Sequence, residues 1–470
     1  MEKKRIPLDA VGWMVGVSAL ILFGCSSLRH ALFQSASWDL GIFDQAVYLI
    51  SQGKAPISSF LGFHILGDHA AWVLYSLGLL YKIYPSVYWL FAVQAAALAF
   101  SGLLASRIAC QAGLMKHQAV AIAFSYLLYP LVFNINLYDF HPEVIAIPAL
   151  FGAILAARSQ QVVWFCISII VVLGCKAVLS LSVAAMGIWL LVFEKKRICG
   201  AIAIIAGIFW FIVACNIIIP HFGGSAATVA RHIPRYSYLG SSFAEIAQNL
   251  LFKPNLILRQ IFSLNTLEYL ALLLAPLIWG LSPKHLTPLI AAIPTLVLNI
   301  LANTDQQRNL VHQYSLPILP FLLVAAIDNL TFGGGWLRNP RAIIIWSLVS
   351  FLALGKYGYF GSIYLNSLDT RQATQKAIAL VQTEDNQKKA IYTTAEIAPH
   401  LSHRLLIKFT DSHSTSTDFS VFDYILLNVR HPGWLSNREF AAKLVLKLKN
   451  SELFQLRYQR DDVYLFVKKF

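Results

Sequence analysis

Two carboxylates stand close together in SWDLGIFDQ (37–45), directly after the first long apolar run of the chain. Asp39 and Asp44 are five residues apart, so a short helix would point them in different directions, whereas an irregular segment could bring both to one pocket. A carboxylate held among apolar groups has a raised pKa, which suits a general base. The alternative is that Asp39 only caps a helix beginning near Leu40.

Two further acidic clusters contain histidine. In GDHAAW (67–72), His69 is a candidate for a proton relay or a phosphate contact, and Asp68 is equally well placed to cap a helix. In YDFHPE (138–143), Asp139, His141 and Glu143 lie between two apolar runs. These three residues are candidates for ligands of a divalent metal, Mg or Mn, although their spacing is a weak metal signal.

Basic and aromatic residues supply candidate phosphate ligands. Lys176 ends an apolar run, where it either extends toward the membrane interface or binds an anionic headgroup. Arg231 and Arg235 lie among tyrosines in a long loop, and guanidinium groups bind phosphate in a bidentate manner unless the loop is simply solvated. His312 and Tyr314 precede another apolar run and could donate hydrogen bonds to a phosphate or sugar, or Tyr314 could anchor the helix end.

The composition identifies a membrane protein. Of 470 residues, 57% are hydrophobic and 13% charged, whereas soluble globular proteins have about 25% charged residues. The net charge of +14 comes from short Lys and Arg clusters between apolar runs, which set membrane orientation and give no nucleic-acid-binding surface. The six cysteines lie in or beside apolar segments without metal-site spacing, as expected for small packing residues.

Eleven apolar segments are long enough to predict spanning helices. We interpret a twelfth run, 70–84, as a helix in the membrane interface. If it crossed, the basic clusters at 195–197 and 338–341 would lie on the opposite side from residues 3–5, against the positive-inside rule. The N-terminus is then cytoplasmic and the C-terminus extracytoplasmic. The predicted spans are 11–29, 86–108, 118–136, 143–158, 162–176, 178–193, 198–219, 267–282, 286–302, 314–330 and 342–361.

This topology brings the acidic, histidine and tyrosine clusters to one face, which predicts a single extracytoplasmic site. The chain divides into a membrane domain, 1–363, with a first outer loop at 30–85, and a small soluble α/β domain, 364–470. In that domain AIYTTA and FDYILLNV predict strands, REFAAKLVLKLKN an amphipathic helix, and FQLRYQRDDVYLFVKK a hairpin turning near 460–462.

Several segments in order resemble the bacterial membrane-protein family known as domain of unknown function 2079, among them WDLGIFDQAVYLISQGKAP, YDFHPEVIAIPAL and VHQYSLPILPF. That family in turn looks like the type C glycosyltransferases. The resemblance implies a polytopic α-helical protein of the inner membrane that takes a polyprenyl-phosphate-linked sugar donor and a glycan, lipid or protein acceptor. It also implies Asp39 as the catalytic base, Asp44 as its supporting carboxylate, and interfacial helices near 40–52 and 70–84. The supporting or acceptor-site residues would then be Asp68, His69, Asp139, His141 and Glu143, the last three as a second acidic site near the acceptor or a metal.

Inverting transfer in one displacement is the expected chemistry, with Lys176, Arg231, Arg235 and His312 as candidates to stabilise the leaving phosphate. The sequence departs from the family at Ala177 and Val178, where two acids usually follow the lysine, and this argues against a metal there. The rival functions are a transporter or flippase of a lipid-linked substrate and a non-catalytic envelope assembly protein. The charged clusters lie at span ends and no repeat is evident, which disfavours a transporter.

Overall fold

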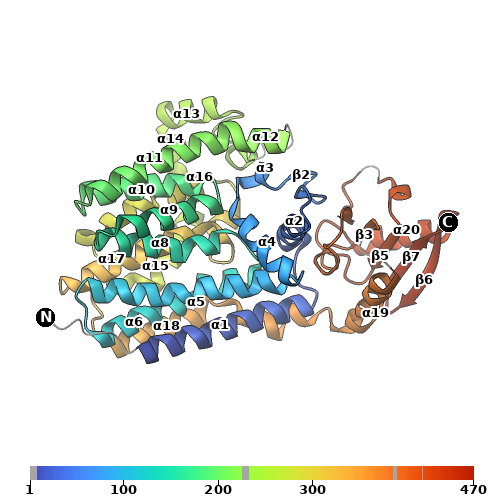
Figure 1. Cartoon of the computed structure of the whole chain (residues 1–470), viewed down its shortest axis with the longest axis horizontal. Coiled ribbons are helices and arrows are strands. Elements are labelled where there is room, and N and C mark those ends of the chain that lie inside the picture. Colours follow the sequence, from blue (N-terminus) through green and yellow to red (C-terminus); the bar gives the residue numbers. More distant parts are fainter. Residues whose placement is uncertain (1–7, 225–231, 385–388, 415–416, 470) are drawn as a thin grey trace.

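The structure is a computed structural model that describes residues 8–224, 232–384, 389–414 and 417–469. A bundle of helices forms one part of the molecule and a small sheet with two helices the other (Figure 1). The helices of the bundle are α1 (Leu8–Ala31), α5 (Tyr88–Gln111), α6 (Lys116–Leu127), α7 (Pro130–Tyr138), α8 (Glu143–Arg158), α9 (Val162–Cys175), α10 (Leu179–Val192), α11 (Arg197–Val213), α12 (Ile219–Gly223), α13 (Phe243–Phe252), α14 (Pro254–Ile261), α15 (Leu264–Leu274), α16 (Ile293–Leu301), α17 (Leu319–Thr331) and α18 (Pro340–Leu354).

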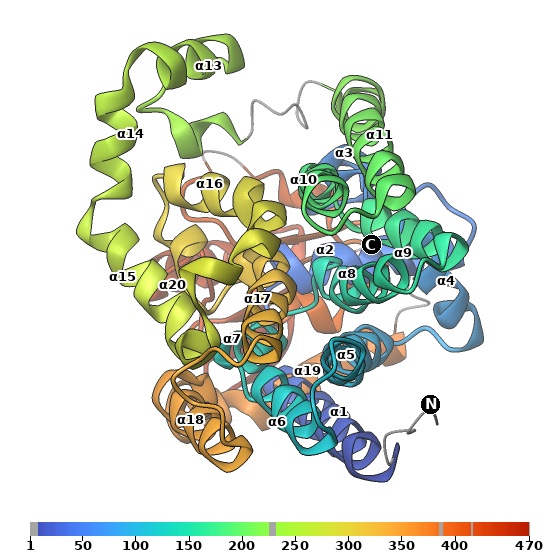
Figure 2. The same ribbon diagram turned by 90° about the vertical axis from the view of Figure 1, so that its left-hand side faces the viewer.

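All eleven segments predicted to span are helical over most of their length. By length and apolar composition, five described helices can cross a membrane, or seven if each of two bent pairs is one span. The remaining apolar helices are shorter, and several predicted spans are broken, as at the junction of α6 and α7. Seen end-on, the helices stand side by side, with α13, α14 and α15 forming an arm along one flank (Figure 2).

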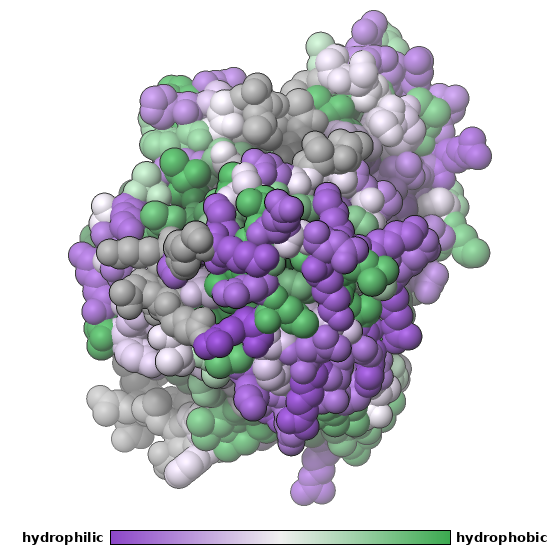
Figure 3. Space-filling view, turned by 90° about the vertical axis from the view of Figure 1, so that its right-hand side faces the viewer, coloured by the Kyte–Doolittle hydropathy of each residue, from purple (hydrophilic) through white to green (hydrophobic). Residues whose placement is uncertain are grey.

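Large apolar side chains on the outer faces of the bundle are exposed, among them Trp13, Leu20, Ile205, Phe209 and Val349. Exposed apolar residues in this number are tolerated where lipid replaces water. The C-terminal part lies at one end of the molecule, on the right in Figure 1, and its surface there is largely hydrophilic (Figure 3). The chain is therefore a multi-pass membrane protein with a polar unit at one end of its bundle.

Small residues allow the closest helix packing, between α10 and α11. A Cβ atom at Gly187 would lie 2.7 Å from the Gly200 carbonyl oxygen, and one at Gly207 would lie 2.6 Å from the Ser180 carbonyl oxygen. Apolar side chains gain little from association within lipid, so close backbone approach through small residues stabilises such pairs. This contact fixes the position of the turn before α10, which carries Lys176.

The segment between α1 and α5 lies between the bundle and the C-terminal sheet (Figure 1). It contains a π-helical turn (Ser37–Gly41), α2 (Ile42–Ser51), the hairpin β1 (Ile57–Ser58) and β2 (Phe63–His64), α3 (Leu66–His69) and α4 (Val73–Ile83). The predicted helix 40–52 corresponds to α2. The predicted helix 70–84 begins later, because Ala70 adopts a left-handed conformation (φ 53°) that separates α3 from α4. At 11 residues, α4 is too short to cross a bilayer.

The C-terminal unit is a five-stranded mixed sheet of order β4-β3-β5-β7-β6, flanked by α19 (Leu368–Glu384) and α20 (Arg438–Lys449). Alternate residues of β5 face the two helices: Tyr424 and Leu426 pack in the α19 core, and Ile425 and Leu427 pack in the α20 core. The predicted strands, amphipathic helix and hairpin are confirmed. The strands are β3 (Ile391–Thr393), β4 (Ile407–Phe409), β5 (Tyr424–Asn428), β6 (Phe454–Arg460) and β7 (Val463–Lys468).

Gln45 of α2 forms hydrogen bonds that hold the C-terminal unit against the segment between α1 and α5. Its side-chain amide donates to the carbonyl oxygen of Arg404 (2.9 Å), and its amide oxygen accepts from the hydroxyl of Ser58 and the backbone N–H of Ser59. The Ser59 hydroxyl in turn donates to the Ile407 carbonyl oxygen and accepts from the Ile407 N–H. Gln45 is fully buried, so the Arg404 carbonyl, the Ser58 hydroxyl and the Ser59 N–H would lose a buried partner without it.

We predict that Gln45→Ala loosens this interface, because several buried polar groups lose their partner. The expected loss is about 2 kcal/mol of docking free energy, which accelerates exchange of the amide hydrogens of residues 404–407 roughly thirtyfold in hydrogen–deuterium exchange. Gln52→Ala, at the exposed end of the same helix, is the matched control. Equal exchange in both variants would contradict this role of Gln45.

Candidate active site

A cavity of about 880 Å³ lies at the end of the bundle next to the C-terminal unit. Its lining includes the π-helical turn after α1, the turn between α7 and α8, and the turn between α9 and α10. Apolar side chains from α11, α12 and α16 line one part of the cavity. The charged, histidine and tyrosine residues lining it are Asp39, Asp68, His69, Tyr138, His141, Glu143, Lys176, His232, Arg235, Tyr236, His312 and Tyr314.

Asp39 and His141 form an ion pair in this cavity. The Nε2 atom of His141 lies 3.2 Å from Oδ1 of Asp39, and the two side chains are 4% and 21% exposed respectively. Burial opposes both charges, but the hydrogen bond and charge of His141 lower the pKa of Asp39 below its ordinary value. The same contact raises the pKa of His141. The contact therefore favours the ionised carboxylate of Asp39 and the protonated ring of His141.

Two expectations for Asp39 are therefore wrong. The apolar sequence around Asp39 suggested a raised pKa, but the contact with His141 lowers it. The sequence did not reveal this contact, because the histidine comes from a turn about a hundred residues away. Asp39 also caps no helix, since it lies inside the π-helical turn and its side chain is bound to His141. The carboxylate remains turned toward the cavity.

Asp44 lies apart from the cavity lining. Its carboxylate accepts hydrogen bonds from Tyr81 of α4 (2.5 Å) and from Ser402 of the C-terminal unit, and it is paired with His403 (3.1 Å). The two acids of SWDLGIFDQ therefore have different surroundings: Asp44 is bound by Tyr81, Ser402 and His403, whereas Asp39 is paired with His141. Its contacts connect α2 to α4 and to the C-terminal unit.

In the turn 138–143, the side chains of Asp139, His141 and Glu143 contact different partners. Asp139 accepts from the Arg29 guanidinium (2.5 Å) and from the backbone N–H of Ala36 (2.9 Å), and does not line the cavity. Glu143 is paired with Lys176 (2.6 Å), with both side chains buried. The expected metal site of Asp139, His141 and Glu143 is consequently not assembled, because each residue is committed to a different partner.

Asp68, His69 and His232 form a group suited to a metal ion. One ligand atom from each residue lies within 4.8 Å of the others. The Nε2 atom of His69 lies 3.4 Å from a carboxylate oxygen of Asp68, and the rings of His69 and His232 are stacked 5.6 Å apart. Two imidazoles and one carboxylate favour Zn²⁺ or a similar transition metal over Mg²⁺. Asp68 lies within α3 and caps no helix.

Arg235 is the available cation of the cavity. Within the described part of the chain, no carboxylate lies within ion-pair distance of its guanidinium, which lies 5.4 Å from the centre of the Tyr314 ring. The Lys176 ammonium lies 5.9 Å from the same ring but is neutralised by Glu143. Arg231, the other arginine expected to bind phosphate, lies outside the described residues.

His312 is not a cation. Burial lowers its pKa to about 4, so its ring is neutral near pH 7. Its Nδ1 atom lies 2.9 Å from Oδ1 of Asn309, an atom that already accepts two backbone N–H groups, so Nδ1 carries the proton. The Nε2 atom is then an acceptor. The expectation that His312 stabilises a phosphate anion is not supported by this arrangement, which suits a hydroxyl donor.

Tyr138 and Trp434 are among the lining residues that were not singled out from the sequence as site residues. Tyr138 contacts both His141 and His312 through its ring, and its position beside Asp139 was a usable signal. Trp434 comes from the C-terminal unit, and only the docking of that unit brings it to the cavity. No local sequence pattern indicates such a contact.

An apolar helical bundle with a charged cavity at one end defines a multi-pass membrane protein with a candidate ligand site. The family described as "Predicted membrane protein (DUF2079)" matches residues 29–465, so the chain belongs to this family. The resemblance inferred from the sequence is thereby confirmed. Among curated proteins, none matches the chain.

Two solved structures share the fold along almost the entire chain. ArnT from Cupriavidus metallidurans bound to undecaprenyl phosphate has a TM-score of 0.57 and 11% identity, covering 98% of each chain. The apo state of the same protein has a TM-score of 0.51 and 10% identity, covering 97% of this chain and 98% of the other. This similarity establishes the fold and confirms the predicted type C glycosyltransferase-like class.

The Asp39–His141 pair predicts a specific pH dependence of stability. The raised pKa of His141 makes its contribution complete below about pH 6.5, the unfolded value, and the contribution is lost as the pH rises through the folded value. The lowered pKa of Asp39 makes its contribution present above about pH 4 and lost in stronger acid. The pair therefore stabilises the protein most between these limits.

We predict that His141→Gln destabilises the protein by about 1 to 3 kcal/mol at pH 5.5 and by much less at pH 9. Thermal unfolding of the detergent-solubilised protein measures the difference between variant and wild type at each pH. His117→Gln, at an exposed position, controls for general effects of histidine removal. An equal loss at both pH values would show that no charged pair exists.

Proposed function

We propose that the protein transfers a sugar from a polyprenyl-phosphate donor to an acceptor, within the cavity of about 880 Å³. The observation that carries the proposal is that Asp39, an ionised carboxylate, and Arg235, an arginine that has no carboxylate partner within the described ranges, line one cavity with an apolar side. The fold shared with ArnT, which has been solved with undecaprenyl phosphate bound, supports the same class of ligand.

The donor lipid is assigned to the apolar side of the cavity. Phe211, Cys215, Ile219 and Leu298 form an apolar surface there for a prenyl chain, and Arg235 lines the same space. A guanidinium binds phosphate in a bidentate manner and stabilises the negative charge that grows on the leaving phosphate. Lys176, whose charge is balanced by Glu143, and His312, whose ring is uncharged, have no such role in the proposal. Tyr314, between Lys176 and Arg235, is assigned to the sugar or phosphate.

Asp39 is assigned to the acceptor. In a single displacement, the acceptor oxygen attacks the anomeric carbon while the bond from that carbon to the phosphate oxygen breaks, and the phosphate leaves with the electron pair. Asp39 orients the acceptor hydroxyl and takes its proton, and His141 holds the carboxylate in position. Asp44 and Asp139 hold the surrounding segments together and have no chemical role in this scheme.

The orientation in the membrane belongs to the same proposal. The positive-inside rule puts the N-terminus in the cytoplasm and the C-terminal unit outside the inner membrane. A cavity at the extracytoplasmic face has no supply of nucleotide sugars, whereas a lipid-linked donor reaches it through the bilayer. A glycan, lipid or protein acceptor then approaches from the side of the C-terminal unit.

We predict that Asp39→Asn lowers transfer about 10² to 10⁴-fold, because the amide cannot take a proton, while binding of undecaprenyl phosphate is retained. Arg235→Ala is expected to weaken that binding by tenfold or more, since a charged hydrogen bond is lost. Lipid analysis of cells with and without the gene identifies the donor as an accumulating polyprenyl-phosphate sugar, and isothermal titration of the purified protein measures undecaprenyl phosphate binding.

Asp461→Asn, in the distant β6–β7 turn, is the control for Asp39→Asn. Unchanged undecaprenyl phosphate binding in Arg235→Ala, together with an unchanged lipid profile, would contradict the transferase and favour an assembly protein. Movement of a lipid-linked substrate across the bilayer that survives Asp39→Asn would favour a flippase.

A divalent metal is proposed at Asp68, His69 and His232. Such an ion would supply positive charge beside the donor phosphate, at the same cavity as Arg235. We predict about one equivalent of zinc in the full-length protein after incubation with ZnCl₂ and desalting, and a loss of that equivalent in His69→Ala and His232→Ala. Elemental analysis measures the metal, with the exposed His413→Ala as control. Equal zinc in all four proteins would contradict the site.

A further inference from the structure

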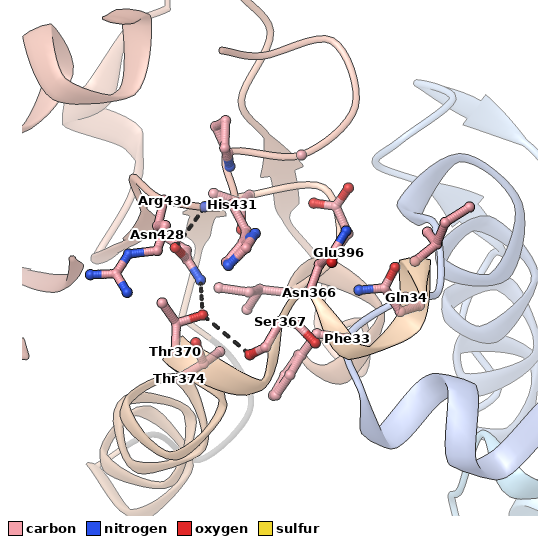
Figure 4. Close-up of a pocket in the computed structure, with 15 residues that line it drawn as sticks. Phe33, Gln34, Asn366, Ser367, Thr370, Thr374, Glu396, Asn428, Arg430 and His431 are labelled. Atoms are coloured by element: carbon pink, nitrogen blue, oxygen red, sulfur yellow. Dashed lines mark hydrogen bonds between the residues drawn. The ribbon is translucent and has the colours of Figure 1, made fainter. Parts of the chain in front are cut away.

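A second cavity, of about 240 Å³, lies between the end of α1 and the C-terminal unit. Its walls come from residues 33–34 after α1, from 363–374 around the start of α19, and from the loops after β3 and β5. None of its lining residues lines the larger cavity. Figure 4 shows Gln34, Asn366 and Glu396 gathered on one side of this space, with Thr370, Asn428 and His431 on the other.

Hydrogen bonds fix several of these polar side chains in advance. Asn428 donates from its amide to the Thr370 hydroxyl (3.0 Å) and accepts from the backbone N–H of His431 (3.0 Å), as drawn in Figure 4. The His431 ring is paired with Asp369 (2.8 Å). A set of amides and hydroxyls held in place is suited to an uncharged ligand that both donates and accepts hydrogen bonds.

Two buried oxygen atoms of the cavity have no hydrogen-bond partner in the part of the chain that the structure describes. Glu396 accepts from the Trp434 N–H through Oε1 (3.2 Å), but its Oε2 atom has no partner. The hydroxyl of Thr394, a residue with no exposed surface, has none either. Buried polar groups are nearly always hydrogen-bonded, because an unsatisfied one costs about 1–3 kcal/mol. These two atoms are therefore the points where a ligand hydroxyl would bind.

The backbone keeps the Glu396 carboxyl in this position. A Cβ atom at residue 433 would lie 2.1 Å from Oε2, so only glycine leaves room for the carboxyl group. Gly433 also has a φ of +85°, which glycine adopts without strain. Among the described residues no cation pairs with Glu396, and burial raises its pKa to about 7.

The charge around the cavity disfavours an anionic ligand. Arg430 is already paired with Asp369 (3.0 Å) and Asp462 (2.8 Å), which leaves the carboxyl of Glu396 as the uncompensated group. A volume of 240 Å³ is below the range of about 300–1,000 Å³ that holds drug-sized ligands. The size and the polar lining together suit a single sugar ring.

We propose that this cavity binds one neutral saccharide unit, with ligand hydroxyls donating to Oε2 of Glu396 and bonding to the hydroxyl of Thr394. This inference rests on the proposed transferase function, in which the saccharide would belong to a glycan acceptor held by the C-terminal unit. The connection is the loop 432–434, because Gly433 lines the small cavity while Trp434, whose N–H binds Glu396, lines the large one.

Titration of the full-length protein in nanodiscs with glucose, galactose, mannose, arabinose and N-acetylglucosamine tests the inference by saturation-transfer NMR. We expect at least one sugar to bind. Glu396→Gln should weaken its binding by tenfold or more, because the amide retains the oxygen for the Trp434 N–H and places a donor where Oε2 was. Thr394→Val, of the same shape, should also weaken it. The exposed Glu439→Gln serves as the matched control.

Binding of none of the five sugars, or equal binding by wild type and both variants, would overturn the inference. If Glu396→Gln fails to fold, as judged by thermal unfolding, Thr394→Val alone decides. Undecaprenyl phosphate binding, measured on the same samples, separates this result from the proposed function: sugar binding without lipid binding would remove the transferase and keep the saccharide site, and lipid binding without sugar binding would do the reverse.

Discussion

Ionisable groups inside an apolar bundle must be paired, and in this protein the turn between α7 and α8 provides the pairing. A single buried charge without a partner costs several kcal/mol, so each group in the turn needs a partner from another element. Each of its three charged side chains pairs with a residue from a different segment, and these segments are far apart in sequence. The pairs are Arg29–Asp139, Asp39–His141 and Lys176–Glu143.

This pairing determines both shape and chemistry. It ties the end of α1, the π-helical turn and the start of α10 to one short turn, so the cavity has fixed walls. The backbone of Asp139 adopts a φ of 133°, which non-glycine residues rarely accept, and the bonds to Arg29 and Ala36 hold it there. Most charges of the cavity are thereby neutralised. Arg235 is left as the group best suited to bind an anion.

Much of the fold could be predicted from the sequence. Apolar runs long enough to cross a bilayer identified the helical segments, and alternating residues identified β5 and the β6–β7 hairpin. The short strand β4 and the polar helix α19 were not predicted, because three residues show little periodicity and α19 is weakly apolar. The clusters at Asp39, Asp68 and His141 were correctly expected to share one region, since span ends on one side of a membrane must meet there.

The partners of the individual residues could not be predicted. Spacing indicates that Asp139, His141 and Glu143 are near each other in the chain, but their side-chain directions depend on the positive φ of Asp139 and on the break before α8. The separation of Asp44 from Asp39 depends on contacts with Tyr81 and the C-terminal unit. Such contacts join residues up to about 360 positions apart, which no local pattern encodes.

A cryo-EM map of the protein in nanodiscs with undecaprenyl phosphate tests the central claim most directly. We predict the phosphate in the large cavity, in contact with the Arg235 guanidinium. Its prenyl chain should lie along α11 and α16, and the Asp39 carboxylate should face the same space. A lipid phosphate bound at the other end of the bundle, or a cavity in which Asp39 is turned away and bound to the C-terminal unit, would contradict it.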